Sequence, residues 1–201
     1  MSSGAQQTRG SEVVRAALID QAAKMLGEVG PSRISVRDVA ARAGVNHGQV
    51  HHYFGGKRGL LNAAMTHLAR GHYEHSNALR GDAPFPPVLS LAADSGYWRA
   101  VCQVVMDGDL ELARLEVDEG ISVPRAALAT LLEQHRGQQS ELEIKAKFAA
   151  LAASQLGWVA FEQFMFLVAD VEPDEQEALR TEVKKIFEDT VAREIDSAKS
   201  I

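Results

Sequence analysis

Residues 35–57, SVRDVAARAGVNHGQVHHYFGGK, decide the fold of this chain of 201 residues. Ser35 followed by Asp38 is a variant of the capping box, in which Asp38 replaces the usual Glu or Gln, so a helix is predicted to begin at Ser35. Gly44 then supplies a tight turn, and Asn46 with Gln49 predicts a second capped helix. The stretch therefore predicts two short helices joined by a turn.

The second of these helices is unusually polar. Only three of its side chains are predicted to contact a core: Val50, Tyr53 and Phe54. Its other positions carry hydrogen-bonding side chains or none: His47, Gly48, Gln49, His51 and His52. A thin apolar face beside a dense polar face predicts contact with water or with a charged partner.

Helical periodicity continues on both sides of this stretch. Apolar residues recur at spacings of three and four, and no stretch alternates with the period of a strand. Glycine and proline mark the ends of the predicted helices, most clearly in the loop 81–87. The further helices are predicted at 11–29, 57–80, 88–106, 109–119, 124–136, 141–170 and 173–195. The predicted fold class is all-α.

The charge is distributed unevenly along the chain. The net charge is -6, but residues 1–70 hold nine Lys and Arg against four Asp and Glu, so this part is basic and the remainder acidic. That asymmetry is typical of a nucleic-acid-binding module attached to a second part, with chance clustering of solvated charges as the alternative. The single cysteine, Cys102, excludes an internal disulfide framework and fits the cytoplasm, and the start MSSGAQQTRG has no apolar signal region.

The helix predicted at 141–170 is apolar around most of its circumference. Residues 148–161 contain no charge, which predicts burial on more than one side. A membrane span is the rival interpretation, but 14 uncharged residues are too few, so no membrane is predicted. Together with the last helix, it predicts a four-helix interface between two chains. The candidate dimer residues are Ala153, Gly157, Ala160, Phe164, Val183 and Phe187.

The segments SVRDVAARAGV and HHYFGGKRGLL resemble the TetR family of transcriptional regulators, over roughly residues 12–68. The resemblance implies an all-helical homodimer whose N-terminal helix-turn-helix binds a palindromic operator, and whose C-terminal domain binds a small molecule that releases the DNA. The implied organisation is a flexible tail at 1–10, a DNA-binding domain at 11–56, a connecting helix at 57–80, and an effector-binding and dimerisation domain at 81–201.

Nine residues are candidates for contact with double-stranded DNA: Arg37, Asn46, His47, Gly48, Gln49, His51, His52, Tyr53 and Lys57. A recognition helix places its N-terminal side chains against base edges, and Gln49 paired with adenine contributes about 1–3 kcal/mol of discrimination. Tyr53 and Lys57 match family positions that hold the phosphate backbone. Gln49 and His51 depart from the family pattern, where Thr or Ser and Tyr are common, so operator preference does not carry over.

Seven residues are candidates for lining an effector pocket: Trp98, Cys102, Met106, Gln155, Trp158, Phe161 and Glu162. Pockets are largely apolar with a few fixed polar groups, although ordinary core packing explains the same residues equally well. His72 is a weaker candidate for a polar contact.

The main hypothesis is therefore a repressor that an effector releases from DNA, without a cofactor. One alternative is a small-molecule-binding protein with a vestigial helix-turn-helix. The other is a helical metalloenzyme using His47 and His51, one helical turn apart, but no further ligand lies nearby in the sequence. Because we find no nucleophile–base pattern, phosphate loop or carboxylate pair, we predict neither a metal site nor an enzyme.

Overall fold

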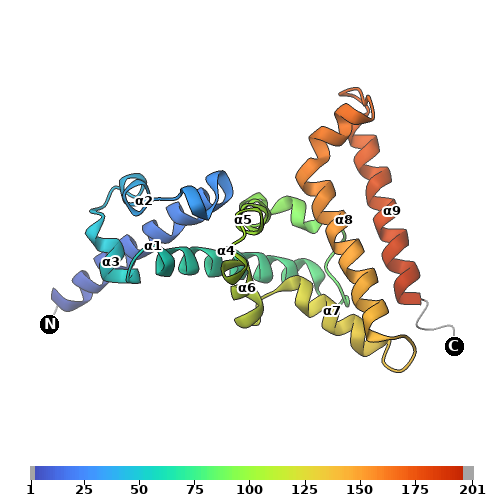
Figure 1. Ribbon diagram of the computed structural model, residues 1–201, viewed down its shortest axis with the longest axis horizontal. Coiled ribbons are helices and arrows are strands. Elements are labelled where there is room, and N and C mark those ends of the chain that lie inside the picture. The colour runs from blue at the N-terminus through green and yellow to red at the C-terminus, as the bar shows by residue number, and fades with distance from the viewer. Residues whose placement is uncertain (1–2, 197–201) are drawn as a thin grey trace. The chain divides into compact units, whose positions relative to one another are not determined.

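The computed structural model describes residues 3–196, and no strand occurs in this range (Figure 1). The all-α prediction is therefore confirmed for the described chain. Its elements are α1 (Ser3–Val29), η1 (Pro31–Arg33), α2 (Val36–Arg42), α3 (Gly48–Phe54), α4 (Lys57–Arg80), η2 (Ser90–Ala93), α5 (Ser95–Met106), α6 (Leu110–Asp118), α7 (Val123–Gln134), α8 (Glu141–Val168) and α9 (Gln176–Asp196).

The chain divides into two compact units. The first unit comprises Met1–Glu74 and Ser95–Ser122, and the second comprises His75–Asp94 and Val123–Ile201. This division differs from the predicted boundary at residue 81, because α5 and α6 belong to the same unit as the helix-turn-helix. The physical reason is that α5 packs on α1 and buries Tyr97.

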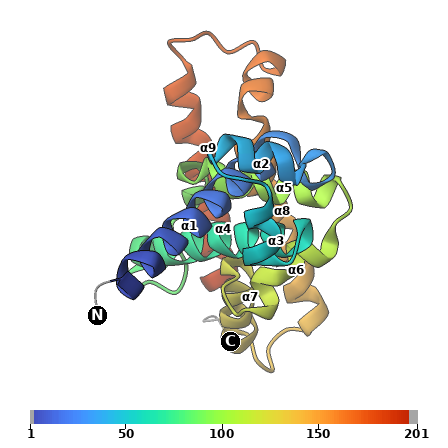
Figure 2. The same cartoon turned by 90° about the vertical axis from the view of Figure 1, so that its left-hand side faces the viewer.

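The core of the first unit is built from the apolar faces of its helices. Figure 2 shows α1, α2 and α3 of this unit close together. The largest fully buried side chains are Leu18, Leu26, Val39, Val50, Leu60, Met65, Val104 and Leu112. Gly27 permits the close approach of α5, since a Cβ atom there would lie 3.3 Å from the Cβ atom of Arg99. Leu18 and Leu26, which lie two helical turns apart in α1, thus face this core.

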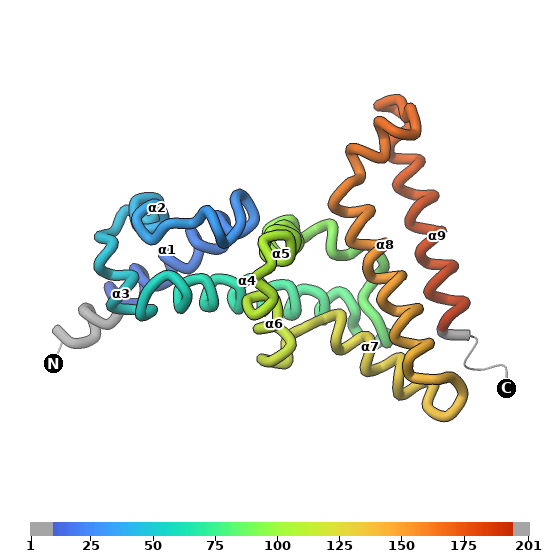
Figure 3. The backbone as a smooth tube through the Cα atoms, viewed as in Figure 1, coloured from blue at the N-terminus to red at the C-terminus, as the bar shows by residue number. Residues whose placement is uncertain are grey.

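In the second unit, α8 and α9 run side by side in opposite directions (Figure 3). Two ion pairs join them: Arg180 Nε lies 2.9 Å from Glu162 Oε1, and Lys147 Nζ lies 3.3 Å from Glu194 Oε2. The guanidinium of Arg180 also lies 5.0 Å from the centre of the Phe166 ring. The two helices therefore form a hairpin joined by two ion pairs and a cation–π contact.

Helix α8 is much less buried than its sequence predicts. Only Ile144 and Phe166 are buried, so the prediction of burial on several sides is wrong for the single chain. The reason is that α8 packs on α7, η2 and α9 and leaves much of its apolar surface exposed. By length and composition alone α8 also qualifies as a membrane span, with a hydropathy of 1.3 over a window that is 6% buried, which is weak evidence for a membrane.

The starts of several helices differ from the prediction, and α9 begins at Gln176 rather than near residue 173. Helix α1 begins at Ser3, so Ser11 lies inside the helix and residues 3–10, predicted as a flexible tail, form its first turns. Helix α5 begins at Ser95 rather than near residue 88, because Leu89 adopts a left-handed conformation with φ 58° ahead of the short η2 turn. Helix α3 begins at Gly48, and its N-cap residue His47 makes no capping hydrogen bond through its side chain.

Candidate DNA-binding site

Helix α2 is held at its start by Ser35. The Ser35 hydroxyl oxygen accepts a hydrogen bond from the Asp38 backbone N–H at 3.1 Å and donates to the Asp38 carboxylate at 2.6 Å. The carboxylate thus pairs with the cap hydroxyl instead of the backbone N–H of a standard capping box. Val39 and Ala40 are buried behind it, while Arg37 is exposed. The capping prediction is confirmed, with this change of partner.

The turn into α3 is formed by Gly44 and Asn46. Gly44 has φ 68°, a left-handed conformation that glycine adopts without strain. The Asn46 side-chain oxygen accepts a hydrogen bond from the Gly48 backbone N–H at 2.8 Å. Asn46 therefore satisfies one of the free N–H groups at the start of α3, although the predicted reciprocal bond to Gln49 does not form.

Helix α3 presents a polar face to the outside. Val50 is its single fully buried side chain, while Gln49, Tyr53 and Phe54 are half-buried. The remaining candidate readers are exposed: Asn46, His47, Gly48, His51 and His52. The thin apolar face inferred from the sequence is thus what anchors α3, and the imidazole side chains are free to meet a partner.

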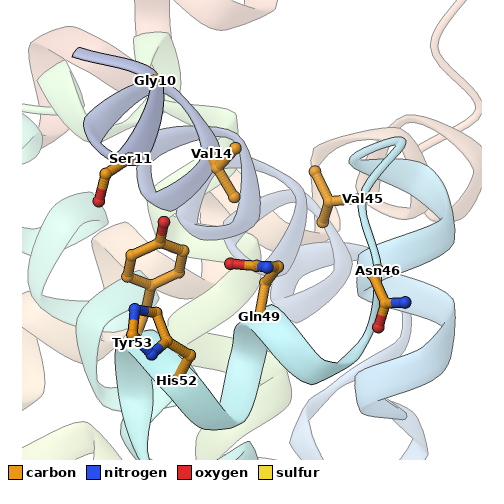
Figure 4. Close-up of a pocket in the computed structure, with 8 residues that line it drawn as sticks. All are labelled: Gly10, Ser11, Val14, Val45, Asn46, Gln49, His52 and Tyr53. Atoms are coloured by element: carbon orange, nitrogen blue, oxygen red, sulfur yellow. The ribbon is translucent and has the colours of Figure 1, made fainter. Parts of the chain in front are cut away.

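A hollow of about 530 Å³ lies beside α3, between it and α1 (Figure 4). The residues that line it are Gly10, Ser11, Val14, Val45, Asn46, Gln49, His52 and Tyr53. Gln49 points into the hollow, and the hydroxyl of Tyr53 is directed toward α1. The α1 residues of this set were missed by the sequence analysis, because a helical repeat does not show which exposed turn lies beside α3.

The start of α4 lies close to the turn before α2. Lys57 is the first residue of α4, and its Nζ atom lies 3.5 Å from the Ser32 carbonyl oxygen. A Cβ atom at Gly59 would lie 1.9 Å from the Phe54 carbonyl oxygen, so glycine is required where α4 passes the end of α3. On the other side, the Arg15 guanidinium lies 5.5 Å from the centre of the Phe54 ring. The end of α3 is thus fixed from two helices.

Two aspartates of the loop between α5 and α6 bind the turn before α2 and the start of α4. The Asp107 carboxylate accepts a hydrogen bond from the Ser32 backbone N–H at 2.9 Å, which lowers the pKa of Asp107. Arg58 donates to Asp109 at 2.6 Å, and this bond lowers the pKa of Asp109 and raises that of Arg58. Sequence reasoning missed both contacts, because each joins residues more than 50 positions apart.

The candidate effector residues fall into two groups. Trp98, Cys102 and Met106 lie on α5 in the first unit, where Met106 is exposed and burial raises the pKa of the Cys102 thiol. His72, in the same unit, stacks on Tyr97 with ring centres 4.1 Å apart.

The other four candidates lie on α8 in the second unit. Glu162 is paired with Arg180, Trp158 contacts the Phe166 ring edge to face, and the Gln155 side chain accepts a hydrogen bond from the Leu89 N–H at 3.0 Å. Phe161 is exposed. Three of these four side chains therefore already have structural partners.

The histidines of α3 do not gather further metal ligands. Within the described part of the chain, no group of three or more His, Cys, Asp or Glu side chains is placed to hold a metal ion. The candidate side chains supply imidazole, amide, hydroxyl, guanidinium and ammonium groups, which bind through hydrogen bonds and charge.

Comparison with known proteins gives a consistent result. Residues 18–64 match the profile of bacterial regulatory proteins of the tetR family. The chain is 30% identical over 185 residues to the HTH-type transcriptional repressor Rv3405c of Mycobacterium tuberculosis, covering 92% of this chain and 90% of that protein. It is 41% identical over 82 residues to the HTH-type transcriptional regulator BetI of Burkholderia thailandensis, covering 41% of this chain and 42% of BetI.

The fold is also shared with a solved structure. The crystal structure of a tetR-family transcriptional regulator from Streptomyces coelicolor matches with a TM-score of 0.53 and 20% identity, covering 91% of this chain and 82% of that one. These relatives point to a regulator rather than an enzyme. Similarity over nearly the whole length of a repressor, together with the exposed polar helix α3, leads to one conclusion: the chain belongs to the tetR family of bacterial regulatory proteins and is a DNA-binding transcriptional regulator.

Proposed function

We propose that this regulator is a homodimeric repressor, which binds a palindromic operator through α3 and leaves it when a small molecule binds. The observation that carries the proposal is the polar face of α3, where exposed imidazole and amide groups stand in the basic first third of the chain. The acidic charge of the remaining residues makes that part of the chain a poor partner for DNA. A protein with this activity works in the cytoplasm.

The proposed DNA contacts divide by chemistry. His47 and His51 read base edges, and Gly48 allows the backbone to come close. Gln49, whose side chain points into the hollow beside α1, contacts the DNA from that side. Tyr53 and Lys57 contact phosphates, since an ammonium group at the start of α4 adds to the positive end of that helix. The remaining candidates, Arg37, Asn46 and His52, flank this set.

The proposed dimer interface lies on α8 and α9. Ala153, Gly157 and Ala160 provide small side chains along α8, and Phe164 is 57% exposed in the single chain. Exposed apolar residues continue this surface: Leu167, Val168 and Ile186. A surface of this kind on a protein that binds a palindrome is best covered by a second copy, with Val183 and Phe187 completing the contact from α9.

The proposed effector acts by shifting the population between forms that fit and do not fit the operator. The candidate contacts in the first unit are Trp98, Cys102 and Met106, and those in the second unit are Gln155, Trp158, Phe161 and Glu162. Each set combines apolar groups with a few polar atoms, which suits a mainly apolar ligand. No cofactor is proposed.

The deciding experiment measures binding of a labelled fragment from the gene's own upstream region by fluorescence anisotropy. Lys57→Ala should weaken DNA binding because one phosphate contact is lost. The slope of log affinity against log salt concentration should become shallower by about one. Lys24→Ala is the matched control, since Lys24 is an exposed lysine of the same unit that pairs with Asp20 at 2.8 Å. Equal binding by both variants would contradict the proposed DNA face. Failure to select any preferred sequence from random oligonucleotides would instead favour a vestigial helix-turn-helix.

A further inference from the structure

We infer that the hollow between α1 and α3 holds a phosphate of the bound DNA, and that Ser11 of α1 is a DNA-contact residue. The inference rests on the proposed DNA face, which it extends from α2 and α3 to a third helix. Four candidate DNA residues line the hollow from one side: Asn46, Gln49, His52 and Tyr53. Ser11 closes it from the other side, 24 positions before the start of the helix-turn-helix motif at Ser35.

The chemistry of the hollow suits a phosphodiester. Every polar side chain in its lining is a hydroxyl, an amide or an imidazole, and none carries a carboxylate. The lining therefore carries no negative charge that would repel a phosphate. Neutral hydroxyl and amide groups are regular phosphate donors in protein–DNA complexes, where they fix the register of the protein on the duplex.

The orientation of two hydroxyl groups supports the same occupant. The Tyr53 hydroxyl is directed toward α1, on the side of the hollow where the Ser11 hydroxyl lies (Figure 4). The neighbouring His52 ring contacts the Tyr53 ring edge to face, with ring centres 4.8 Å apart. Two donors from different helices thus face one opening beside the recognition helix.

The position of the hollow also fits the path of a DNA strand. A helix that enters the major groove has sugar–phosphate backbone on both flanks, so a wall beside α3 meets phosphates rather than base edges. Helix α1 forms that wall, and Val14 supplies an apolar surface for the sugar. Because α1 extends back to Ser3, the exposed Gly10 and the half-buried Ser11 belong to a helix and not to a loose tail.

The test compares the same charge at two neighbouring positions of α1. Ser11 lines the hollow, whereas Val13 is 68% exposed and lies about 200° around the helix from Ser11. Ser11→Asp should weaken binding of the upstream fragment about 10- to 100-fold, because a carboxylate would stand against the phosphate. Val13→Asp should change it by less than about 3-fold, because the solvent screens a charge on the other side. Thermal melting of each variant separates these effects from loss of folding.

A second pair of variants tests whether a positive charge at position 11 is attracted to the DNA phosphate. Ser11→Lys should steepen the slope of log affinity against log salt concentration by about one, while Val13→Lys should leave the slope unchanged. Equal losses for the two Asp variants, or equal slopes for the two Lys variants, would overturn the assignment of Ser11. If Lys57→Ala still weakens binding in that case, the proposed DNA face stands and only its extension to α1 is lost.

Discussion

The carboxylate of Asp107 accepts the backbone N–H of Ser32 at 2.9 Å, although the two residues are 75 positions apart. This bond joins the α5–α6 loop to the turn that precedes α2. At Gly30 in the same turn, a Cβ atom would lie 2.8 Å from an Asp107 oxygen, so the carboxylate occupies the place of a side chain. The turn before the helix-turn-helix is therefore defined by a residue from outside the motif.

Asp107→Ala should lower the melting temperature at neutral pH and flatten its acid dependence. The hydrogen bond from Ser32, aided by Arg33 and Lys57, lowers the pKa of Asp107, so its contribution is present above the ordinary aspartate pKa and is lost as the pH falls through the lowered value. Melting curves from pH 7 to pH 3 should show that the difference in melting temperature between wild type and variant becomes smaller in acid. Asp82→Ala, in an exposed loop, is the control, and an equal pH response in both variants would contradict this role.

Asp109→Ala should destabilise the protein more than Arg58→Ala. Asp109 caps α6 by accepting the Leu112 N–H at 3.2 Å and also pairs with Arg58, whose side chain is 46% exposed. Loss of the cap costs about 1 kcal/mol, while loss of the exposed pair costs at most about 0.5 kcal/mol. Urea denaturation in low salt and in 1 M salt separates the contribution of the helix cap from that of the ion pair. High salt should abolish the destabilisation caused by Arg58→Ala and leave the part caused by loss of the cap. Equal costs for both variants would show that the cap contributes little.

Substitutions at Asn46 should separate folding from DNA binding. Asn46→Ala removes the acceptor for the Gly48 N–H and should cost about 1 kcal/mol of stability. Asn46→Asp keeps an acceptor at the start of α3 and should retain the wild-type melting temperature. Its negative charge should nevertheless weaken DNA binding more than alanine does, which anisotropy would measure. Retained binding by the stable Asp variant would place Asn46 away from the DNA.

Leu167→Glu should disrupt the proposed dimer, whereas Leu142→Glu should not. Both leucines lie on α8 and are similarly exposed, at 79% and 77%, but only Leu167 adjoins the exposed Phe164. A buried glutamate in the interface should raise the dimer dissociation constant at least about tenfold. Light scattering after size-exclusion chromatography would measure this, and a monomer produced by both substitutions or by neither would argue against this face.

Capping and turn chemistry made most of the fold predictable. Ser35 and Ser140 each accept a backbone N–H three residues ahead, so these helix starts are encoded within a few residues of sequence. Helix α4 begins at Lys57 and ends at Arg80 as predicted from its flanking glycines. Leu89 shows the limit of such reasoning, because no local rule indicates a left-handed leucine in a helical pattern.

The candidate site was predictable on α3 but incomplete around it. The exposed imidazoles of His47 and His51 follow from the helical repeat of one short segment. The contacts of Ser11 and Asp107 depend on which helices pack together, and sequence periodicity describes one helix at a time. Exposure of α8 was missed for a related reason, since an apolar helix looks the same whether its own chain or another covers it.

The first unit is discontinuous, and this sets an order of events during protein synthesis. Tyr97 and Val104 of α5 are part of its core, and Asp107 follows them, so the ribosome must pass all three before the unit can close. A nascent chain that has emerged only as far as Glu74 lacks α5, the helix on which α1 packs. The DNA-binding segment is therefore made early but completed late, after the loop containing Leu89 has been translated.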